Sequence, residues 1–408
     1  MTQKPFDLVL FGATSFVGKI TAHYLLERFG VEGDLKWAAA ARSQSKLDAL
    51  KAELGPAGAD LPLIVADAMS NDDMAQLCTQ TDAVASTVGP YALYGEALVK
   101  ACAESGIDYC DLTGEVQWIR RMIERYQAAA VQSGARIVHC CGFDSIPSDL
   151  GVLFLQLEAR KKFGAPCTEV RMRLEAWSGA VSGGTIASLL NVSKEAAQDQ
   201  ALRRELRNPY SICPPEHGYS HRQPRISPSA YDDANKEWVA PFVMEPINSR
   251  IVHRSNALLS NAYGDQFVYS EGMLMGPGVA GRVKANSFGY GMDTFMVMTA
   301  IPPLRAGLER FVLPAPGQGP TPKQQADGFY NMRFWGKTAN GETLVTKVTG
   351  DMDPGYGSTA KMLGESAVLF REIPKSKKGG AFWTPATMFG EQLIERLVAH
   401  AGLTFDIA

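Results

Sequence analysis

Two glycines near the start of the chain have a spacing that could serve a dinucleotide cofactor. Gly12 and Gly18 bracket a short turn in the stretch LVLFGATSFVGKI, which runs from Leu8 to Ile20. Gly12 can make the tight turn, and Gly18 can let a helix pack close to a strand. The first N–H groups of such a helix lack partners and point at an anion, so the turn can hold a pyrophosphate. The alternative is an ordinary connection between a strand and a helix.

The middle of this turn departs from the usual G-x-G-x-x-G pattern, because Ser15 stands where a glycine is expected. Serine is small, and its hydroxyl can donate a hydrogen bond to a phosphate, so the departure is tolerable. We expect Ser15 to contact the cofactor together with its neighbours in the turn, Thr14, Phe16 and Val17.

The residues after the second apolar run decide between the two nicotinamide cofactors. The run Leu35–Ala41 ends in Arg42 and Ser43, and Lys46 follows shortly. An NAD site usually places an acidic residue here, whose carboxylate accepts hydrogen bonds from the ribose hydroxyls. An arginine instead suits a 2′-phosphate, through bidentate pairing and stacking on the adenine. The sequence therefore predicts NADP, and a solvated arginine after a strand is the alternative.

Two further strand ends supply candidate cofactor contacts. The third apolar run is followed by Asp67, at a position that often faces the adenine. The fourth run leads into the sequence GPY, where a glycine and a proline would keep side chains away from a bound dinucleotide. The contacts expected there are Val88, Gly89, Pro90 and Tyr91.

These candidates follow the ends of apolar runs that alternate with helical stretches, which indicates a particular fold. The predicted strands are Leu8–Phe11, Leu35–Ala41, Leu61–Ala66, Ala83–Val88, the strand within IDYCDLTGE, and Ala135–Cys141. The predicted helices include Lys19–Arg28, Gly95–Ser105 and Glu115–Gln132. Strands and helices that alternate in this way form a doubly wound parallel sheet, so the fold class is α/β with an N-terminal Rossmann domain.

The pattern changes after Cys167, where TEVRMRLEAWS alternates apolar and charged residues as a half-buried antiparallel strand does. A hairpin is expected around the turn Asn340-Gly341, and Asn208–Ala240 is expected to be a long irregular excursion. We predict an NAD(P)-binding Rossmann domain over residues 1–150 and an α+β, mixed-sheet domain for substrate binding and dimerisation over residues 151–355. Residues 356–408 are predicted to be helices that pack back on the Rossmann domain.

Composition excludes several classes of function. The 408 residues carry 40 basic and 43 acidic side chains, a net charge of −3 that gives nucleic acid no basic surface. The sequence contains no apolar run of about 18 residues, the length that a membrane span needs, and MTQKPFD lacks the apolar core of a signal peptide. The seven cysteines and six histidines lack metal-ligand spacing, so no metal site is predicted. We expect a cytoplasmic protein, with peripheral membrane contact left open.

Longer motifs carry a resemblance to a known family. VGPYALYGEALVKACAESGIDYCDLTGE, from Val88, and GARIVHCCGFDSIPSDLG, from Gly134, are similar to the saccharopine dehydrogenase-like oxidoreductases, and more narrowly to their trans-acting enoyl reductase branch. The similarity extends to SGGTIAS at Ser182, MDPGYGSTAKMLGESAVLF at Met352 and GGAFWTPATMFG at Gly379. It implies an NADPH-dependent oxidoreductase that reduces a carbon–carbon double bond in a lipid-like, acyl or polyketide-derived substrate, as in lipid or glycolipid metabolism.

Enoyl reduction by hydride leaves an enolate, which needs an oxyanion stabiliser and a proton donor. Tyr91 and Tyr94 follow the fourth strand, where the nicotinamide should lie, and either can donate or simply pack its ring. After the sixth strand, Asp144 and Ser145 are expected either to act on the substrate or to cap the next helix. Gly142 and Phe143 are expected to line the nicotinamide pocket.

Two other functions remain open at this point. One is the imine or amino-acid oxidoreduction that the family name suggests, which would need basic residues to hold several carboxylates. The arginines at 171, 173, 203, 204 and 207 are available but form no clear clamp. The other is a nucleotide-binding module without turnover. The expected partner is a small-molecule substrate, and a homodimer is left open.

Overall fold

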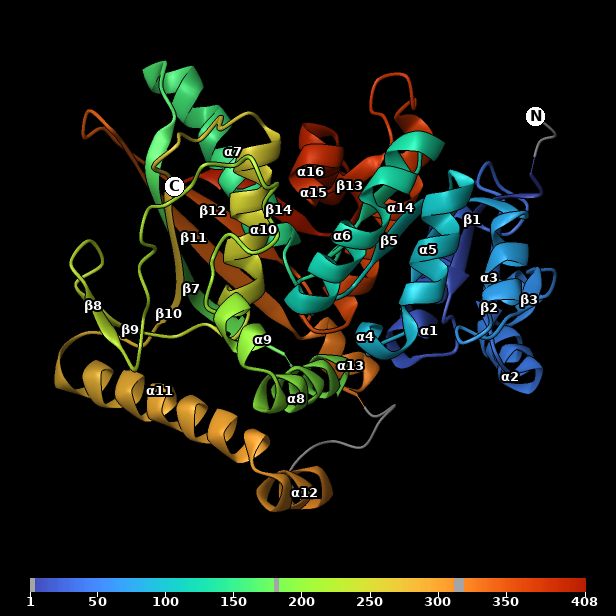
Figure 1. Ribbon diagram of the computed structural model, residues 1–408, viewed down its shortest axis with the longest axis horizontal. Helices are drawn as coiled ribbons and strands as arrows, with labels where there is room; N and C mark the ends of the chain where they lie inside the picture. Colours follow the sequence, from blue (N-terminus) through green and yellow to red (C-terminus); the bar gives the residue numbers. More distant parts are fainter. Residues whose placement is uncertain (1–3, 180–182, 312–318) are drawn as a thin grey trace. The chain divides into compact units, whose positions relative to one another are not determined.

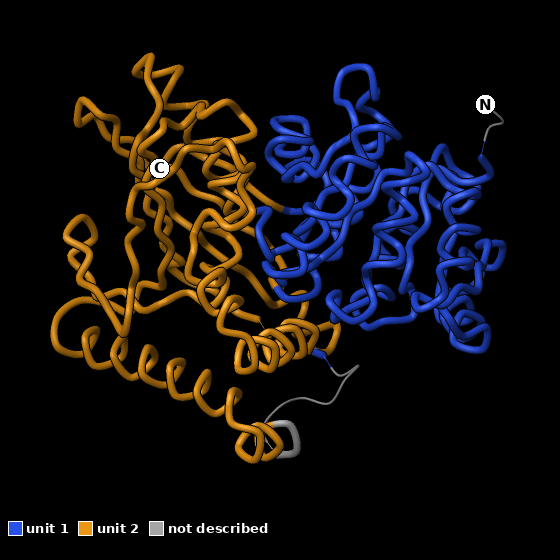
Figure 2. Tube along the Cα trace, in the orientation of Figure 1, with its two compact units in different colours: residues 1–146, 317–319, 355–402 blue, residues 147–316, 320–354, 403–408 orange. Residues whose placement is uncertain are grey.

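The computed structural model describes residues 4–179, 183–311 and 319–408. The chain folds into two compact units, which Figure 2 distinguishes by colour. Among the described residues, unit 1 consists of 4–146, 319 and 355–402, and unit 2 consists of 147–179, 183–311, 320–354 and 403–408. The chain therefore passes from one unit to the other several times.

Unit 1 contains a seven-stranded sheet in which every neighbouring pair is parallel. The strand order is β13-β6-β5-β4-β1-β2-β3. The strands are β1 (Phe6–Phe11), β2 (Trp37–Ala41), β3 (Leu63–Val65), β4 (Thr81–Ser86), β5 (Asp108–Asp111), β6 (Arg136–Val138) and β13 (Ala381–Trp383). This arrangement confirms the predicted doubly wound sheet.

The central strands are apolar because helices cover both faces of a parallel sheet. Leu8, Val9 and Leu10 of β1 are fully buried between β2 and β4. The helices of unit 1 are α1 (Phe16–Phe29), α2 (Gln44–Leu54), η1 (Pro56–Gly58), α3 (Asn71–Cys78), α4 (Tyr91–Tyr94), α5 (Glu96–Ser105), α6 (Val116–Ser133), α14 (Gly357–Glu372), α15 (Pro385–Met388) and α16 (Gly390–His400) (Figure 1).

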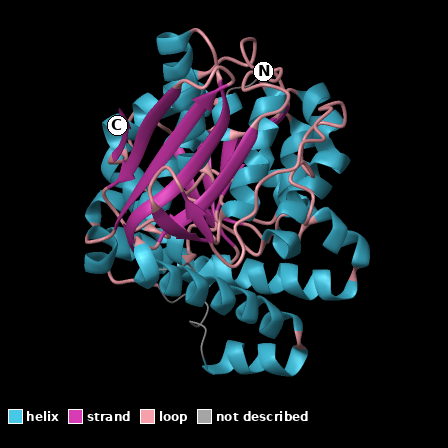
Figure 3. Cartoon of the chain, turned by 90° about the vertical axis from the view of Figure 1, so that its left-hand side faces the viewer, coloured by secondary structure: helices cyan, strands magenta, loops and turns pink. Residues whose placement is uncertain are grey.

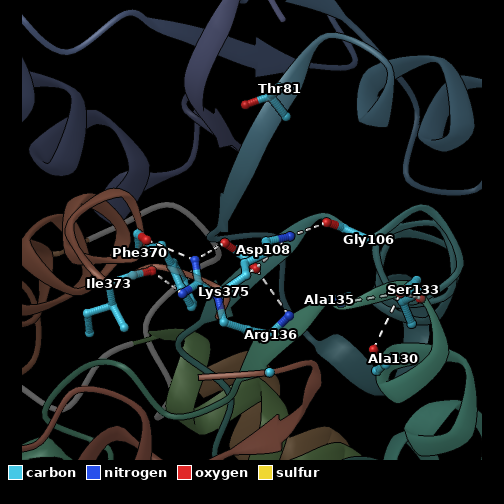
Figure 4. A network of polar contacts seen from close by, with 12 residues as sticks. Thr81, Gly106, Asp108, Ala130, Ser133, Ala135, Arg136, Phe370, Ile373 and Lys375 are labelled. Carbon is cyan, nitrogen blue, oxygen red and sulfur yellow. Dashed lines mark hydrogen bonds and ion pairs between the residues drawn. The ribbon is translucent and has the colours of Figure 1, made fainter. Parts of the chain in front are cut away.

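Residues 355–402 are part of this unit, and a buried ion pair at the amino ends of β5 and β6 holds them in place (Figure 4). Arg136 pairs with Asp108, and both residues are almost fully buried. The same guanidinium donates to the carbonyls of Ile373, at 2.5 Å, and Phe370, at 2.8 Å. Lys375 adds a contact to Asp108 at 3.5 Å. The segment that follows supplies β13, a seventh strand that the sequence did not predict.

Unit 2 contains a mixed seven-stranded sheet, visible in Figure 3, with the order β14-β12-β11-β7-β10-β9-β8. Its strands are β7 (Cys167–Ser178), β8 (Ala230–Asp232), β9 (Glu237–Ala240), β10 (Val268–Leu274), β11 (Phe329–Thr338), β12 (Thr343–Gly350) and β14 (Leu403–Ile407). β7 pairs antiparallel with β11, as predicted, but also parallel with β10. The predicted hairpin is β11–β12, whose turn contains Gly341 at φ +92.

The stretch Asn208–Ala240 was expected to be irregular throughout, and this is wrong at its end. β8 and β9 form a short antiparallel pair there, and β9 joins β10 at the margin of the sheet. The helices assigned to this part of the chain are α7 (Ile146–Phe163), α8 (Gly183–Gln198), α9 (Gln200–Glu205), α10 (Glu245–Leu258), α11 (Gly278–Ala300), α12 (Pro302–Phe311) and α13 (Pro322–Ala326). Among the helices in the described residues, none is both long enough and apolar enough to cross a bilayer.

Candidate functional site

The predicted cofactor turn joins β1 to α1, and both of its glycines are sterically required. Gly12 has φ +87, and a Cβ there would lie 2.7 Å from the Thr87 hydroxyl and from Val88. A Cβ on Gly18 would lie 2.2 Å from the carbonyl oxygen of Gly12. Contacts this short are far inside van der Waals distance, so the close approach of helix and strand needs glycine at both positions.

Ser15 has a structural role in the turn, as a helix cap, that the sequence did not indicate. Its Oγ accepts a hydrogen bond from the Gly18 N–H at 3.0 Å, so Ser15 caps α1, which begins at Phe16 rather than at the predicted Lys19. The same oxygen lies 3.0 Å from Thr87 Oγ1, and Thr87 donates to the Gly12 carbonyl at 2.9 Å. The serine thus links β4, the turn and the helix through one hydrogen-bonded chain.

The turn leaves backbone donors unused. Within the described part of the chain, the N–H groups of Thr14, Phe16 and Val17 have no hydrogen-bond partner. All three residues are half-buried, at the amino end of a helix whose dipole favours negative charge. Donors arranged in this way suit the oxygens of a pyrophosphate.

Two cations lie at the end of β2. Arg42 directly follows the strand, and Lys46 lies in the first turn of α2. Both side chains are exposed, and neither pairs with an acidic group of the described residues. Ser43 is the N-cap of α2, because its hydroxyl accepts from the Lys46 N–H at 3.4 Å. The pair of free cations can hold a 2′-phosphate.

Asp67 lies in the turn between β3 and α3. Its side chain is exposed, and its carboxylate accepts a hydrogen bond from the Met69 N–H at 3.0 Å. Asp67 therefore shapes its own turn and remains accessible to a ligand.

Tyr91 occupies a packing position. Its ring is 5% exposed, its hydroxyl donates to the Ser86 carbonyl at 2.9 Å, and the hydroxyl oxygen accepts from the Leu112 N–H at 3.1 Å. Burial raises the pKa of this phenol well above its usual value, with a further contribution from the charge of Asp111. These contacts favour a structural role for Tyr91 over proton donation. Tyr94 is 38% exposed, at the end of the same short helix.

Glu115 explains how this short helix is held. Its carboxylate accepts from the N–H groups of Tyr91, at 2.7 Å, and Ala92, at 3.1 Å, so it caps α4 from a distance in the sequence. Val88 is half-buried, Gly89 is exposed, and Pro90 is the N-cap residue of α4. The segment after β4 is thereby fixed between the glycine turn and β5.

Asp144 follows β6 and is half-buried. Burial raises the pKa of its carboxyl to about 7, and the charge of Asp111 contributes. Asp111 is fully buried. Its carboxylate accepts hydrogen bonds from His139 Nδ1 at 2.7 Å and from the Tyr109 hydroxyl at 3.0 Å, and these two bonds fix its position. At neutral pH a large fraction of Asp144 therefore carries a proton. Ser145, beside it, is fully buried.

Three residues that sequence reasoning missed complete the surroundings. Thr359 of α14 accepts a hydrogen bond from the Phe143 N–H at 3.0 Å, and a Cβ on Gly142 would lie 2.9 Å from the Thr359 methyl group. The ring of Tyr356 meets Phe16 edge-on, with centroids 4.6 Å apart. The third is Thr87. Thr87 lies near the end of the predicted strand Ala83–Val88, which is a usable signal, but no local pattern relates residues 356 and 359 to residues 16 and 143.

The candidate residues lie at one edge of the sheet. Gly12, Arg42, Asp67, Thr87 and Asp144 follow β1, β2, β3, β4 and β6, whose carboxyl ends share an edge because all the pairs are parallel. Ligands of open α/β sheets bind at this edge, beside the strand where the order reverses, which here is β1. Among the described residues there is no cluster of three or more His, Cys, Asp or Glu side chains that could hold a metal ion.

Comparisons with known proteins show the family to which the chain belongs. Residues 8–138 match the family model of the saccharopine dehydrogenase NADP binding domain. A Mycobacterium tuberculosis protein provisionally named as a trans-acting enoyl reductase is 40% identical over 419 residues, covering 99% of this chain and 98% of the relative. The trans-acting enoyl reductase of Mycobacterium ulcerans is 37% identical over 416 residues, covering 97% and 96%.

One solved structure shares the two-domain fold. Apo saccharopine dehydrogenase (L-Glu forming) from Saccharomyces cerevisiae aligns with a TM-score of 0.54 at 11% identity, covering 99% of this chain and 100% of that one. The family resemblance, the fold class and the NADP(H) cofactor that the sequence predicted are confirmed by these matches.

Proposed function

Because the chain belongs to the trans-acting enoyl reductase branch of the saccharopine dehydrogenase-like oxidoreductases, and is thus an NAD(P)H-dependent oxidoreductase, we propose that it reduces a carbon–carbon double bond of an acyl or lipid-like substrate. The observation that carries the proposal is the pairing of unused N–H donors at Thr14, Phe16 and Val17 with the free cations Arg42 and Lys46 at one sheet edge. This donor set fits the pyrophosphate and 2′-phosphate of NADPH.

Different residues of the chain would bind the cofactor and donate the proton. Bound NADPH supplies a hydride. Gly12 and Gly18 let the phosphates approach the backbone, and the helix α1 supplies the positive end of its dipole. Asp144 would donate a proton to the substrate carbon next to the carbonyl once hydride has reached the other carbon of the double bond. Its raised pKa supports this role, because the group must be protonated near neutral pH to act as an acid.

The arrangement of arginines lends less support to a substrate that carries several carboxylates. Arg173 is buried and pairs with Asp232 at 2.8 Å, and Arg171 pairs with Glu169 at 3.5 Å. Arg203 donates to backbone carbonyls of its own helical region. With these side chains already partnered, an acyl substrate is the better proposal.

The test is a titration with NADPH and with NADH, followed by nicotinamide fluorescence. We expect NADPH to bind more tightly, and Arg42→Ala to weaken NADPH roughly 10- to 100-fold while NADH changes little, since a charge-assisted hydrogen bond contributes about 1.5–3 kcal/mol. Lys51→Ala, which removes a cation from the far end of the same helix, is the matched control.

A preference for NADH, or an equal loss of both cofactors in Arg42→Ala, would overturn the role of Arg42. Tight NADPH binding then allows the reaction to be tested by following NADPH consumption with enoyl thioesters. Binding without turnover on any enoyl substrate would point to a nucleotide-binding module rather than a reductase.

A further inference from the structure

Helix α11 has an inverted distribution of side chains. Its buried positions are small, with Gly281, Ala285 and Gly289 repeating every four residues. A Cβ on Gly289 would lie 1.9 Å from the carbonyl oxygen of Pro228, so the helix packs backbone to backbone on its inner side. A surface helix normally buries its large apolar residues and exposes polar ones. Over the first half of α11, from Gly281 to Gly289, the inner face has no room for large residues.

The most exposed large apolar side chains lie on the outer face, whereas Phe288 and Met296, each 39% exposed, lie away from it. Val279 is 80% exposed, Val283 58%, Tyr290 61% and Val297 58%, and Ile301, directly after the helix, is 41% exposed. With about 100° per residue, these positions fall within a stripe about 40° wide along the whole helix. Figure 1 shows α11 at the periphery of its unit. An apolar stripe this continuous indicates a binding surface.

The stripe is the same when read in either direction from Tyr290. Val283 and Val297 lie seven residues away on each side, and Val279 and Ile301 lie eleven residues away. Closer to the centre, Tyr290 is flanked on both sides by glycine, at 289 and 291. A surface with this symmetry is complementary to itself under a two-fold rotation, which is the geometry of an isologous contact.

Charge supports the same arrangement. The three charged residues of the helix are mirrored across Tyr290 by uncharged ones, in the pairs Arg282 with Met298, Lys284 with Met296, and Asp293 with Ser287. In an antiparallel pair of helices no like charges would therefore meet, and Ser287 could donate to Asp293. A parallel pair in register would bring Asp293 against Asp293, which is unfavourable.

We propose that the outer stripe of α11 binds the same stripe of a second copy of this chain, with the helices antiparallel and the two Tyr290 rings at the two-fold axis. The helix has 23 residues. It is thus about 35 Å long, and a stripe of that length buries roughly 700–800 Å² in total, below the roughly 1,200 Å² at which standard specific interfaces begin and within the range of weak, transient contacts. The dimer is therefore weak, with a Kd on the order of micromolar.

Sedimentation velocity over a range of concentrations, from about 1 to about 100 µM, measures this association. We expect the wild-type chain to shift from monomer to dimer, and Val297→Glu to stay monomeric. The matched control is Val131→Glu, because Val131 is a valine with 57% exposure on α6, and that variant should dimerise like the wild type. Unchanged melting temperatures show that both variants are folded.

Cross-linking tests the direction of the helices. Mixing Val283→Cys chains with Val297→Cys chains should give a disulfide-linked pair under mild oxidation, and neither variant should link to itself. Self-linking of each variant would mean that the helices are parallel and would overturn the proposal. A chain that is monomeric at every concentration would also overturn it.

A third measurement separates a second copy from a lipid surface. Vesicles of phosphatidylcholine and phosphatidylglycerol should not pellet with the wild-type chain, because Asp293 lies beside the stripe and would have to enter the lipid. If the chain pellets with vesicles and Val297→Glu does not, the stripe is a membrane contact and the proposed dimer is wrong.

Discussion

Asp144 in unit 1 and Glu271 in unit 2 are two carboxyl groups whose pKa values are raised alike, but they differ in exposure and in hydrogen-bond partners. Burial is the main cause that raises the pKa of each to about 7. Glu271 is 1% exposed on β10, where it accepts from the Tyr269 hydroxyl at 2.6 Å and from Asn248 Nδ2 at 2.9 Å. Asp144 is half-buried, and no other side chain of the described residues donates to it.

The difference shows that a raised pKa does not by itself identify a catalytic acid. Both oxygens of Glu271 are hydrogen-bonded to neighbouring side chains and are buried away from solvent, so its proton cannot be transferred to a substrate. Asp144 owes its proton to burial and to the charge of Asp111, and its carboxyl accepts a hydrogen bond from its own backbone N–H. The proposed acid is distinguished by its partial exposure and by the absence of side-chain donors to it among the described residues.

The first prediction is that replacing the two acids affects turnover very differently. Asp144→Asn should lower kcat on an enoyl substrate by about 10²- to 10⁴-fold, the usual contribution of a general acid, and leave NADPH affinity unchanged. Glu271→Gln, which keeps the shape of the side chain, should change kcat by no more than a few-fold. Equal losses in the two variants, measured by NADPH consumption, would break the distinction between the two sites.

The second prediction concerns the pH dependence of stability. The pKa of Glu271 in the folded chain is about 7, above its ordinary value of 4.5, so the folded state holds this proton more tightly than the unfolded state. The stabilisation is complete below pH 4.5 and is lost as the pH rises toward 7, by roughly 3 kcal/mol. Glu271→Gln should flatten that fall.

The free energy of unfolding, measured with urea at pH 5 and at pH 8, gives this pH dependence. Asp144→Asn serves as the comparison and should flatten the fall in the same direction, because the pKa of its carboxyl is also raised, from 3.8 to about 7. A wild-type chain whose free energy of unfolding does not fall between these pH values would show that Glu271 is not held as described.

The two sites also differ in how far the sequence predicts them. The glycine turn, Arg42 and the residues after β6 could be found because each follows a local apolar run, and a parallel sheet brings such strand ends together. The predicted strands mostly held, although β6 is shorter than expected at Arg136–Val138. By contrast, Glu271 and Asn248 carry no local sign that they meet, and only the fold of unit 2 joins them.

Other features depend on contacts far apart in the chain. β13 has only three residues, too few for a periodic pattern to predict it, and it pairs with β6 through Ala381 and Arg136. Thr359 reaches Phe143 across more than two hundred residues. The outer stripe of α11 was missed for another reason, since apolar periodicity predicts a helix but is normally interpreted as its buried face.

The last and smallest effect sharpens the contrast by changing the neighbour of Asp144. Because an acid must be protonated to donate, wild-type kcat should fall about tenfold per pH unit above pH 7. Asp111→Asn removes the charge that helps raise the pKa of Asp144, so this fall should begin at lower pH, and kcat at pH 7 should drop by less than about tenfold.

The pH profile of kcat distinguishes this shift in pKa from a loss of structure, which would lower kcat equally at all pH values. Since burial remains the larger cause, the variant should still titrate above the ordinary range of an aspartate. A profile that does not move, or moves to higher pH, would mean that Asp144 is not the proton donor or that Asp111 does not act on it.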